Sequence, residues 1–186
     1  MAHIADDHLR KFKRIRIEIT NSSWITPKVR VLLSTLGGKG LFAVDEIKKG
    51  EKVVVWKGDY AGEIEARQAK EKGKLVMQWD TNLFSIEDRG DDIGYYVNHS
   101  CDSNLWMKDA YTLIARRAIK KSEEITADYA LWEADGNYVS TWACNCGSTN
   151  CRKKVTGKDW RLPEVQKKYN GHFSPLLNKR IAHLLH

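Results

Sequence analysis

The chain is patterned mainly as short strands separated by turns. Residues 12–19, FKRIRIEI, alternate apolar and charged side chains, which is typical of a half-buried strand. Residues 29–33 predict a second strand, and the glycines of GGKG at 37–40 predict a turn before LFAV resumes the sheet. Further strands are expected at 53–56, 75–79, 83–86, 104–108 and 111–117.

Helices are expected at three places. Residues 62–72, GEIEARQAKEK, predict a short polar helix. Residues 163–169 and 174–185 each carry a proline in the first turn, a position that suits the start of a helix. Residues 130–143 look irregular. Many short strands with few helices predict a mainly β (α+β) fold with a helical C-terminal tail.

Length and composition place the chain among folded proteins. Its 186 residues suit one domain with a small appendage, and 42% hydrophobic with 30% charged residues argues against disorder. No run reaches 18 apolar residues, so we expect no membrane span and no membrane partner. The stretch MAHIADDHLRKFKRIRIEI has no apolar signal-peptide core, so we expect an intracellular protein. A net charge of +7 permits contact with an anionic surface.

The four cysteines are the first sign of chemistry. Cys144, Cys146 and Cys151 stand in the short stretch CNCGSTNC, and Cys101 lies far upstream. In a reducing compartment such a cluster indicates a metal before a disulfide, and a structural zinc site takes four ligands. Cys101 is the candidate for the fourth. The alternatives are a disulfide or a reduced cluster without metal, although C-x-C spacing strains a bridge between its own members.

Three other segments are dense in glycine or polar residues. They are residues 38–43, GKGLFA; residues 96–104, YVNHSCDSN; and residues 123–129, EEITADY. Taken singly, each has an ordinary explanation: a hairpin turn, a capped turn and the end of a strand. Their order along one chain, followed by the cysteine stretch, is what carries information.

Together these segments resemble the SET-domain family of protein lysine methyltransferases. The family's signatures run roughly G-x-G, N-H-S-C-x-P-N, G-E-E-L-T-x-D-Y and a post-SET C-x-C-x4-C, where this chain has GKG, NHSCDSN, SEEITADY and CNCGSTNC. The resemblance implies a SET fold of small curved sheets with a knot-like crossing, in which the N-H-S segment lies beside the D-Y segment. The expected parts are an N-terminal flank (1–28), a SET domain (29–131), a post-SET zinc loop (140–157) and a helical tail (158–186).

The resemblance also implies S-adenosylmethionine as methyl donor and zinc in a structural role. Donor and target peptide would occupy opposite faces that a narrow channel joins. Tyr129 matches the family's active-site tyrosine. The implied donor-binding residues are Gly38, Lys39, Gly40, Tyr96, Asn98 and His99, and the implied zinc ligands are Cys101, Cys144, Cys146 and Cys151.

The chemistry explains why a narrow channel is needed. An amine attacks a sulfonium methyl only when neutral, and a free lysine has a pKa of roughly 10.4. Desolvation in a tight apolar channel lowers that pKa, and the Tyr129 hydroxyl can orient the amine. By resemblance, Trp56 and Trp160 are expected as aromatic walls of this channel, with simple packing in the core as the alternative for each.

The size of the channel depends on Ala127, two residues before the tyrosine. Relatives often carry Phe or Tyr there, and the smaller side chain predicts room for di- or trimethylation. Met107 or Trp106 could fill the space instead and reverse this prediction. Tyr95 stands where many relatives have Arg, which bears on contacts to the donor.

The expected partner is a protein with a target lysine, and a histone-like tail is the first candidate. A basic tail needs a local acidic groove, for which the candidates are Glu87, Asp88, Asp91, Asp92, Glu123, Glu124, Glu133 and Asp135. A weak DNA contact could use the basic residues Arg152, Lys153, Lys154, Lys167, Lys168, Lys179 and Arg180, although solvent-facing charge is the simpler explanation. The expected location is cytoplasmic in a bacterium and nuclear or chromatin-bound in a eukaryote or virus.

Two other functions compete with the enzyme. The first is a catalytically inactive SET-fold module that binds peptides; the presence of Asn98, His99 and Tyr129 together favours the enzyme instead. The second is a small zinc-containing nucleic-acid module. A zinc knuckle would place all its ligands in one short segment and include a histidine, whereas Cys101 lies over forty residues before Cys144.

Overall fold

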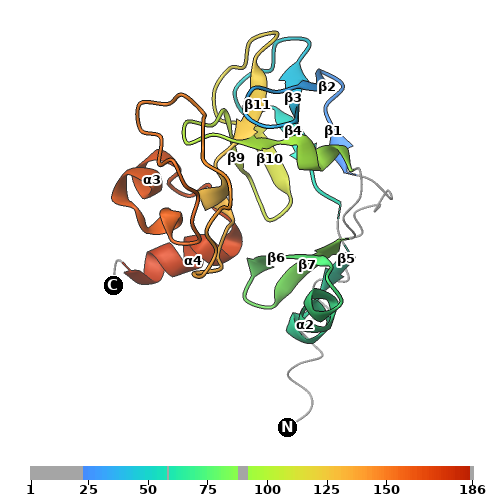
Figure 1. Ribbon diagram of the computed structural model, residues 1–186, viewed down its shortest axis with the longest axis vertical. Helices are drawn as coiled ribbons and strands as arrows, with labels where there is room; N and C mark the ends of the chain where they lie inside the picture. The colour runs from blue at the N-terminus through green and yellow to red at the C-terminus, as the bar shows by residue number, and fades with distance from the viewer. Residues whose placement is uncertain (1–22, 58, 88–91, 185–186) are drawn as a thin grey trace.

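The computed structural model describes residues 23–57, 59–87 and 92–184 (Figure 1). The strand predicted at 12–19 lies outside the described residues, as do Asp88 and Asp91 of the candidate acidic groove. The described strands form three small sheets, and a helical region follows them. Figure 1 shows the first two sheets together, with the third sheet and the C-terminal helices as separate layers against them.

The first sheet is built from apolar strands with a buried face. Its order is β1 (Trp24–Ile25), β4 (Lys52–Val55), β10 (Thr112–Ala115) and β9 (Leu105–Met107), with antiparallel neighbours. Val53, Val54 and Leu113 are fully buried, as β-branched and leucine side chains on a pleated surface favour. The strand predicted over 111–117 ends at Ala115, because the chain bends at the next two residues.

The second sheet brings together segments that are distant in sequence. Its order is β2 (Val29–Leu33), β3 (Lys39–Ala43), β11 (Glu124–Ala127) and β8 (Asn98–His99). β8 and β11 pair in parallel, with Thr126 opposite Asn98 and Ala127 opposite His99. This pairing confirms that the N-H-S and D-Y segments lie side by side.

The third sheet is a separate unit with its own helix. Its order is β5 (Asp59–Ala61), β7 (Leu83–Glu87) and β6 (Leu75–Asp80), and helix α2 (Glu63–Glu71) packs on it through buried Ala66 and Ala69. The helix predicted at 62–72 is confirmed. The short strand β5 was not predicted, because three residues carry too little periodicity to reveal a strand.

The C-terminal region is helical and joins the core of the sheets. It contains the 3₁₀ turns η2 (Tyr129–Leu131) and η3 (Asp159–Arg161) and the helices α3 (Pro163–Lys168) and α4 (Pro175–Leu184). Each helix begins at its proline, as predicted. Tyr169, Phe173 and Leu177 bury their side chains in the same core as Leu113. These elements confirm a mainly β fold with few helices and a helical tail.

The described helices are all too short or too polar to span a bilayer.

Candidate active site and metal centre

One side of the site is organised around the Asn98 side chain. Its Nδ2 donates to the carbonyl of Lys39 at 3.0 Å and to Oε1 of Glu124 at 2.8 Å. The Ser34 hydroxyl donates to the same Glu124 carboxylate at 2.7 Å. A Cβ at Gly40 would come within 2.3 Å of Glu124 Oε1, so a side chain here would displace the carboxylate that holds Asn98. The strand end at β8 and the β3 hairpin are thus held together by polar contacts.

A hollow of about 260 Å³ lies against this arrangement, and we call it the Asn98 cavity. Asn98 and His99 form one wall, Tyr129 forms another, and Trp142 and Cys144 of the cysteine segment close it. Gly38, Lys39 and Tyr96 are close by rather than in its wall. The Lys39 ammonium lies over the Tyr96 ring, 5.5 Å from its centroid.

Tyr129 occupies the centre of the site. Its hydroxyl donates to the carbonyl of Val97 at 3.0 Å, and its backbone N–H donates to Nδ1 of His99 at 3.2 Å. Burial raises the pKa of Tyr129 to about 12, so the phenol stays protonated at neutral pH. The side chain is therefore suited to hydrogen bonding and positioning.

A second hollow, of about 270 Å³, also has Tyr129 in its wall; we call it the Trp56 cavity. The indole of Trp56 stacks on Trp79 with centroids 5.3 Å apart and meets the edge of Trp132 at 5.1 Å. Trp132 also contacts Tyr129, at 5.3 Å between centroids. An aromatic wall of this kind favours a cationic or methylated ammonium. Glu87 and Glu133 also line this cavity.

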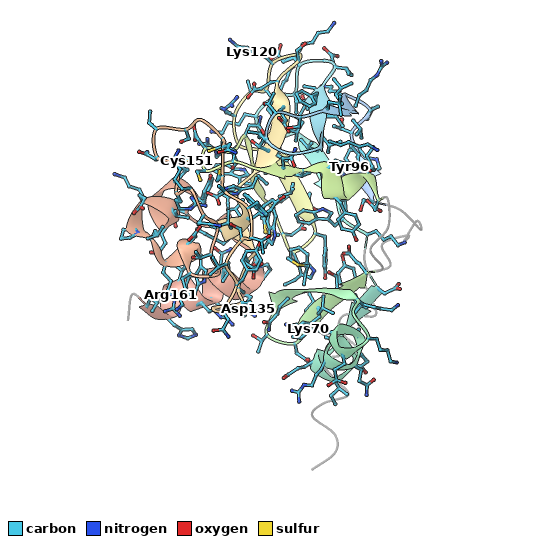
Figure 2. All side chains as sticks on the ribbon, in the orientation of Figure 1. Lys70, Tyr96, Lys120, Asp135, Cys151 and Arg161 are labelled. Atoms are coloured by element: carbon cyan, nitrogen blue, oxygen red, sulfur yellow. The ribbon has the colours of Figure 1, made fainter. Side chains whose placement is uncertain are left out.

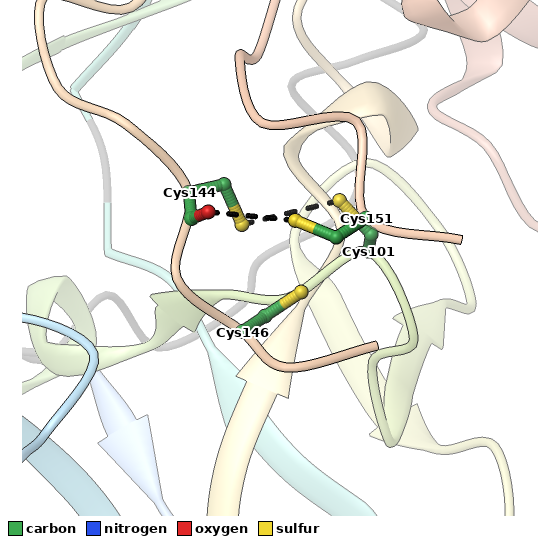
Figure 3. Close-up of side chains that lie close together, drawn as sticks. All are labelled: Cys101, Cys144, Cys146 and Cys151. Carbon is green, nitrogen blue, oxygen red and sulfur yellow. Dashed lines mark hydrogen bonds between the residues drawn. The ribbon is translucent and has the colours of Figure 1, made fainter. Parts of the chain in front are cut away.

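The four cysteines meet in space, although one is remote in sequence (Figure 3). Their sulfur atoms all lie within 4.8 Å of one another, and all four are free thiols. Burial raises the pKa of Cys101 to about 11 and raises that of Cys144, whereas hydrogen bonds bring the pKa of Cys146 down to about 6. A bound divalent cation would keep Cys101 and Cys144 as thiolates at neutral pH. Four converging sulfurs with no open position fit a structural zinc ion.

His99 connects the cysteine cluster to Tyr129. Because Nδ1 accepts the Tyr129 N–H, the neutral ring carries its proton on Nε2, which points at the Cys101 sulfur 3.4 Å away. Burial lowers the pKa of His99 to about 4, so the ring is neutral at physiological pH. The backbone N–H of Arg152 donates to the same sulfur. Such N–H donors orient and stabilise a metal-bound thiolate.

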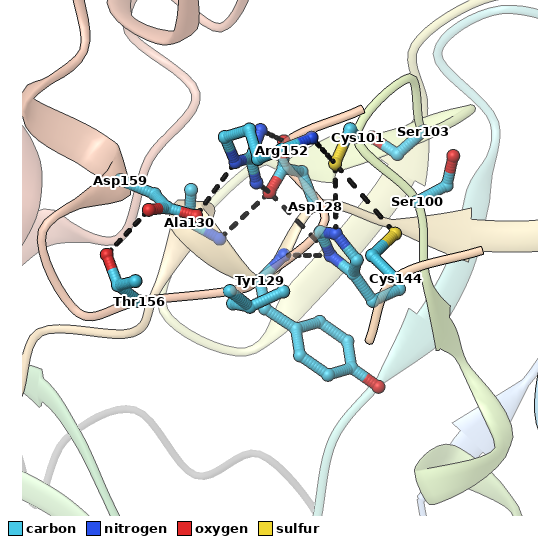
Figure 4. A network of polar contacts seen from close by, with 12 residues as sticks. Ser100, Cys101, Ser103, Asp128, Tyr129, Ala130, Cys144, Arg152, Thr156 and Asp159 are labelled. Carbon is cyan, nitrogen blue, oxygen red and sulfur yellow. Dashed lines mark hydrogen bonds and ion pairs between the residues drawn. The ribbon is translucent and has the colours of Figure 1, made fainter. Parts of the chain in front are cut away.

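A buried ion pair ties the cysteine loop to the tyrosine turn (Figure 4). The Arg152 guanidinium donates to both carboxylate oxygens of Asp128, at 2.9 and 2.5 Å, and to Asp159 at 2.8 Å. Asp128 is fully buried, and the Arg152 side chain is 12% exposed. Sequence reasoning missed this role, because Arg152 reads as one of several basic residues until Asp128 is brought beside it.

The predicted channel residues occupy different environments. Trp56 lines its cavity beside Tyr129, whereas Ala127 is fully buried on β11 and is not part of that wall. Trp160 packs in the core, and its indole donates to the carbonyl of Gly157 at 3.0 Å, away from both cavities. Of the residues that could occupy the space of Ala127, Trp106 stacks on the His172 ring at 3.5 Å, and Met107 is buried; neither lines the Trp56 cavity.

Several residues of the site were not predicted. Trp142 stands two residues before Cys144, and Trp132 stands three after Tyr129. Glu124, which lies within SEEITADY, is predicted only as a candidate for the acidic groove and not as a partner of Asn98. Proximity in sequence to a motif was the available signal. It could not show which of many tryptophans and glutamates turn toward the site.

The candidate DNA-binding cations are mostly engaged within the protein. Lys168 donates to the carbonyl of Cys101 at 2.8 Å, Lys179 pairs with Asp80 at 2.7 Å, and Arg180 donates to the carbonyl of Ala134. With Arg152 buried in its ion pair, the tail presents fewer free cations than the sequence indicated. Two of the candidate acidic residues are also engaged within the protein. Asp92 accepts the backbone N–H of Gly94, and Glu124 accepts the side-chain amide of Asn98.

Comparison with known proteins agrees with this geometry. The SET domain family matches residues 38–130. The chain is 30% identical to Histone-lysine N-methyltransferase ASHH3 of Arabidopsis thaliana, over 69% of this chain and 38% of that protein. It is 28% identical to Histone-lysine N-methyltransferase, H3 lysine-36 specific, of Candida albicans, over 70% of this chain and 17% of that protein.

This chain spans less than two fifths of the length of these relatives. It is also 30% identical to Histone-lysine N-methyltransferase trithorax of Drosophila virilis, over 67% of this chain and 4% of that protein. The match covers the β3 hairpin, the N-H-S strand and the strand that ends at Asp128 and Tyr129. The chain belongs to the SET-domain family.

Proposed function

We propose that this chain transfers a methyl group from S-adenosylmethionine to the side-chain amine of a lysine in a protein, and that the protein is a histone. The observation that carries the proposal is the position of Tyr129, which lines both the Asn98 cavity and the Trp56 cavity. Two substrates entering from opposite sides would meet at its ring. A family of histone-lysine methyltransferases among the relatives agrees with this chemistry.

The Asn98 cavity is the proposed donor site. Gly38, Lys39 and Gly40 would offer backbone groups, Asn98 and His99 polar ones, and Tyr96 and Trp142 aromatic surface. When bound, S-adenosylmethionine supplies an electrophilic methyl on a positively charged sulfur. The residues around it need only orient the two partners and exclude water, because no covalent bond to the protein is required.

Tyr129 is the proposed catalytic residue. Its hydroxyl donates a hydrogen bond to the carbonyl of Val97. The lone pairs of the hydroxyl oxygen remain free to accept from a substrate amine or to make weak C–H···O contacts to a methyl group. With a pKa raised by burial to about 12, the phenol does not serve as a general base at neutral pH. The lysine proton would leave through water instead.

Zinc is proposed as a structural ion held by Cys101, Cys144, Cys146 and Cys151. Four thiolate ligands leave no position for substrate, so the metal would have no direct part in transfer. It would instead fix the segment that carries Trp142, one wall of the donor site. The small side chain of Ala127 is proposed to leave room for the addition of more than one methyl group.

The target peptide is proposed to approach along a groove of about 680 Å³ beside the Trp56 cavity. Lys70 of α2 and Asp135 of the opposite segment line this groove, and both are labelled in Figure 2. Met77, Trp132 and Glu133 line the groove and the cavity alike. In a eukaryote we propose a nuclear, chromatin-bound location; a DNA contact through the basic tail would be weak.

The test is methyl transfer itself. The zinc-loaded protein is incubated with methyl-labelled S-adenosylmethionine and mixed core histones, and peptide mass spectrometry locates the label. We expect label on lysine side chains, with di- or trimethyl product at long times. Binding of the donor without transfer to histones or to other proteins of a cell lysate would contradict the proposal and favour an inactive peptide-binding module.

A further inference from the structure

Among the residues that the structure describes, the carboxylate of Glu87 in the Trp56 cavity has no paired cation. Glu87 ends strand β7 and lines this cavity together with Trp56, Trp79, Trp132 and Tyr129. In the part of the chain that the structure describes, no lysine or arginine forms an ion pair with it. Its neighbour across the cavity, Glu133, is also without an ion pair there, although one of its oxygens accepts the backbone N–H of Asp135 at 3.0 Å.

The position of Glu87 is fixed by the wall of the cavity. Alternate residues of a strand share a face, so Glu87 and Ser85 point the same way. The indole N–H of Trp79 donates to the Ser85 hydroxyl at 2.8 Å, and the same hydroxyl acts to lower the pKa of the Glu87 carboxylate. Because Trp79 stacks on Trp56, Ser85 connects the Glu87 carboxylate to the aromatic wall of the cavity.

A half-buried carboxylate without a cationic partner is costly, because burial removes water from the charged form. Burial accordingly raises the pKa of Glu87 to about 7, and nearby Asp92 raises it further. The charged and titratable groups around it are Lys57, Asp92, Tyr95, Tyr129, Glu133 and Tyr138. Lys57 is the one cation among these six groups, and it makes no ion pair with Glu87. Within the described part of the chain, the Glu87 carboxylate is therefore left without an ion-pair partner, and a substrate can supply one.

We propose that the Glu87 carboxylate binds the ammonium group of the incoming target lysine and so selects a cationic side chain for the Trp56 cavity. This inference rests on the proposed methyltransferase function and names one more substrate-binding residue for it. The carboxylate acts on entry, before the lysine proton is lost. Carboxylate and aromatic faces together recognise an ammonium better than either alone.

The test compares steady-state kinetics of Glu87→Gln with the wild type on core histones between about pH 6 and 9. Removing ground-state binding raises KM with little change in kcat. We expect KM for histones to rise about 10-fold at pH 8, as loss of one charge-assisted hydrogen bond predicts. At pH 6 the difference should shrink, because the native carboxylate is then protonated. The donor's KM should not move.

Glu164→Gln is the matched control, since it makes the same charge change on an exposed part of α3. The wild type alone gives a second readout, a fall in kcat/KM for histones below about pH 7 that Glu87→Gln lacks. If Glu87→Gln keeps the wild-type KM at every pH, the inference is overturned while the methyltransferase function stands. If the wild type transfers no methyl group to any protein, both fall together.

Discussion

Tyr129 is the residue on which both cavities depend. Tyr129→Phe keeps the ring and its contacts but removes the hydroxyl that donates to Val97. Because that oxygen is proposed to orient the amine, we expect kcat to fall about 100-fold or more. Stability should drop by only about 1 kcal/mol, the worth of one hydrogen bond. Labelled-donor transfer and urea unfolding measure the two effects.

Tyr60→Phe is the control for this substitution. Its hydroxyl also donates to a backbone carbonyl, that of Trp56 at 3.5 Å, but Tyr60 is outside both cavities. It should leave kcat near the wild-type value. Equal losses in the two variants would argue that hydrogen bonding in the core, and not the Tyr129 hydroxyl, limits transfer.

Glu87 also has a consequence for stability. Its pKa is raised from 4.5 to about 7 by burial, so between these values the folded chain holds a proton that the unfolded chain has released. Stability from this group is therefore lost as the pH rises through that window. We expect Glu87→Gln to gain melting temperature over the wild type as the pH increases from about 5 to 8. A difference that stays constant with pH would contradict this assignment.

Among the connections between elements, the ion pair from Arg152 to Asp128 and Asp159 joins the cysteine loop to η2 and η3. Arg152→Ala leaves two buried carboxylates without their cation, and we expect a loss of about 3–5 kcal/mol in the free energy of unfolding. The comparison is Arg117→Ala, which breaks an exposed pair with Glu123 and should cost less than about 1 kcal/mol. Similar costs in urea unfolding would mean that the buried pair does not clamp the loop.

Zinc also stabilises a connection between elements. Because the cluster links β8 to the 144–151 loop, chelation should lower stability by about 2 kcal/mol or more, roughly 4–8 °C in melting temperature. Hydrogen exchange should speed up in residues 144–160 and stay slow in β4 and β10. Elemental analysis should find one zinc per chain. Uniform exchange across the chain after chelation would contradict a local clasp.

How far the sequence predicts these elements depends on the type of signal. The strand Val29–Leu33, helix α2 and the proline-led helices follow from local periodicity and capping, and the structure agrees. The meeting of Cys101 with the 144–151 loop followed from the motif order. From the sequence, Arg152 is a solvent-facing or DNA-contacting charge, and Trp160 is either a channel wall or a core residue. The surroundings of both depend on long-range packing that no local pattern encodes.

At the scale of the whole molecule, three sheets and a helical region enclose two cavities that meet at one tyrosine. The parallel pairing of β8 with β11 brings the two recognised motifs together, and the cysteine segment closes the Asn98 cavity from the other side. The walls of the Trp56 cavity come from the residue that follows β4, from strands β6 and β7, from residues 94–97, and from η2 with the segment after it. Such a wall could not be predicted residue by residue, since its tryptophans look like core residues in sequence.

The most direct measurement is a crystal structure of the zinc-loaded chain with S-adenosylhomocysteine and a histone peptide. The account predicts the cofactor product against Asn98 and Trp142, and the lysine side chain between Trp56 and Trp132 with its nitrogen beside the Tyr129 hydroxyl. Both ligands on one side of Tyr129, or a lysine that does not enter the Trp56 cavity, would contradict it.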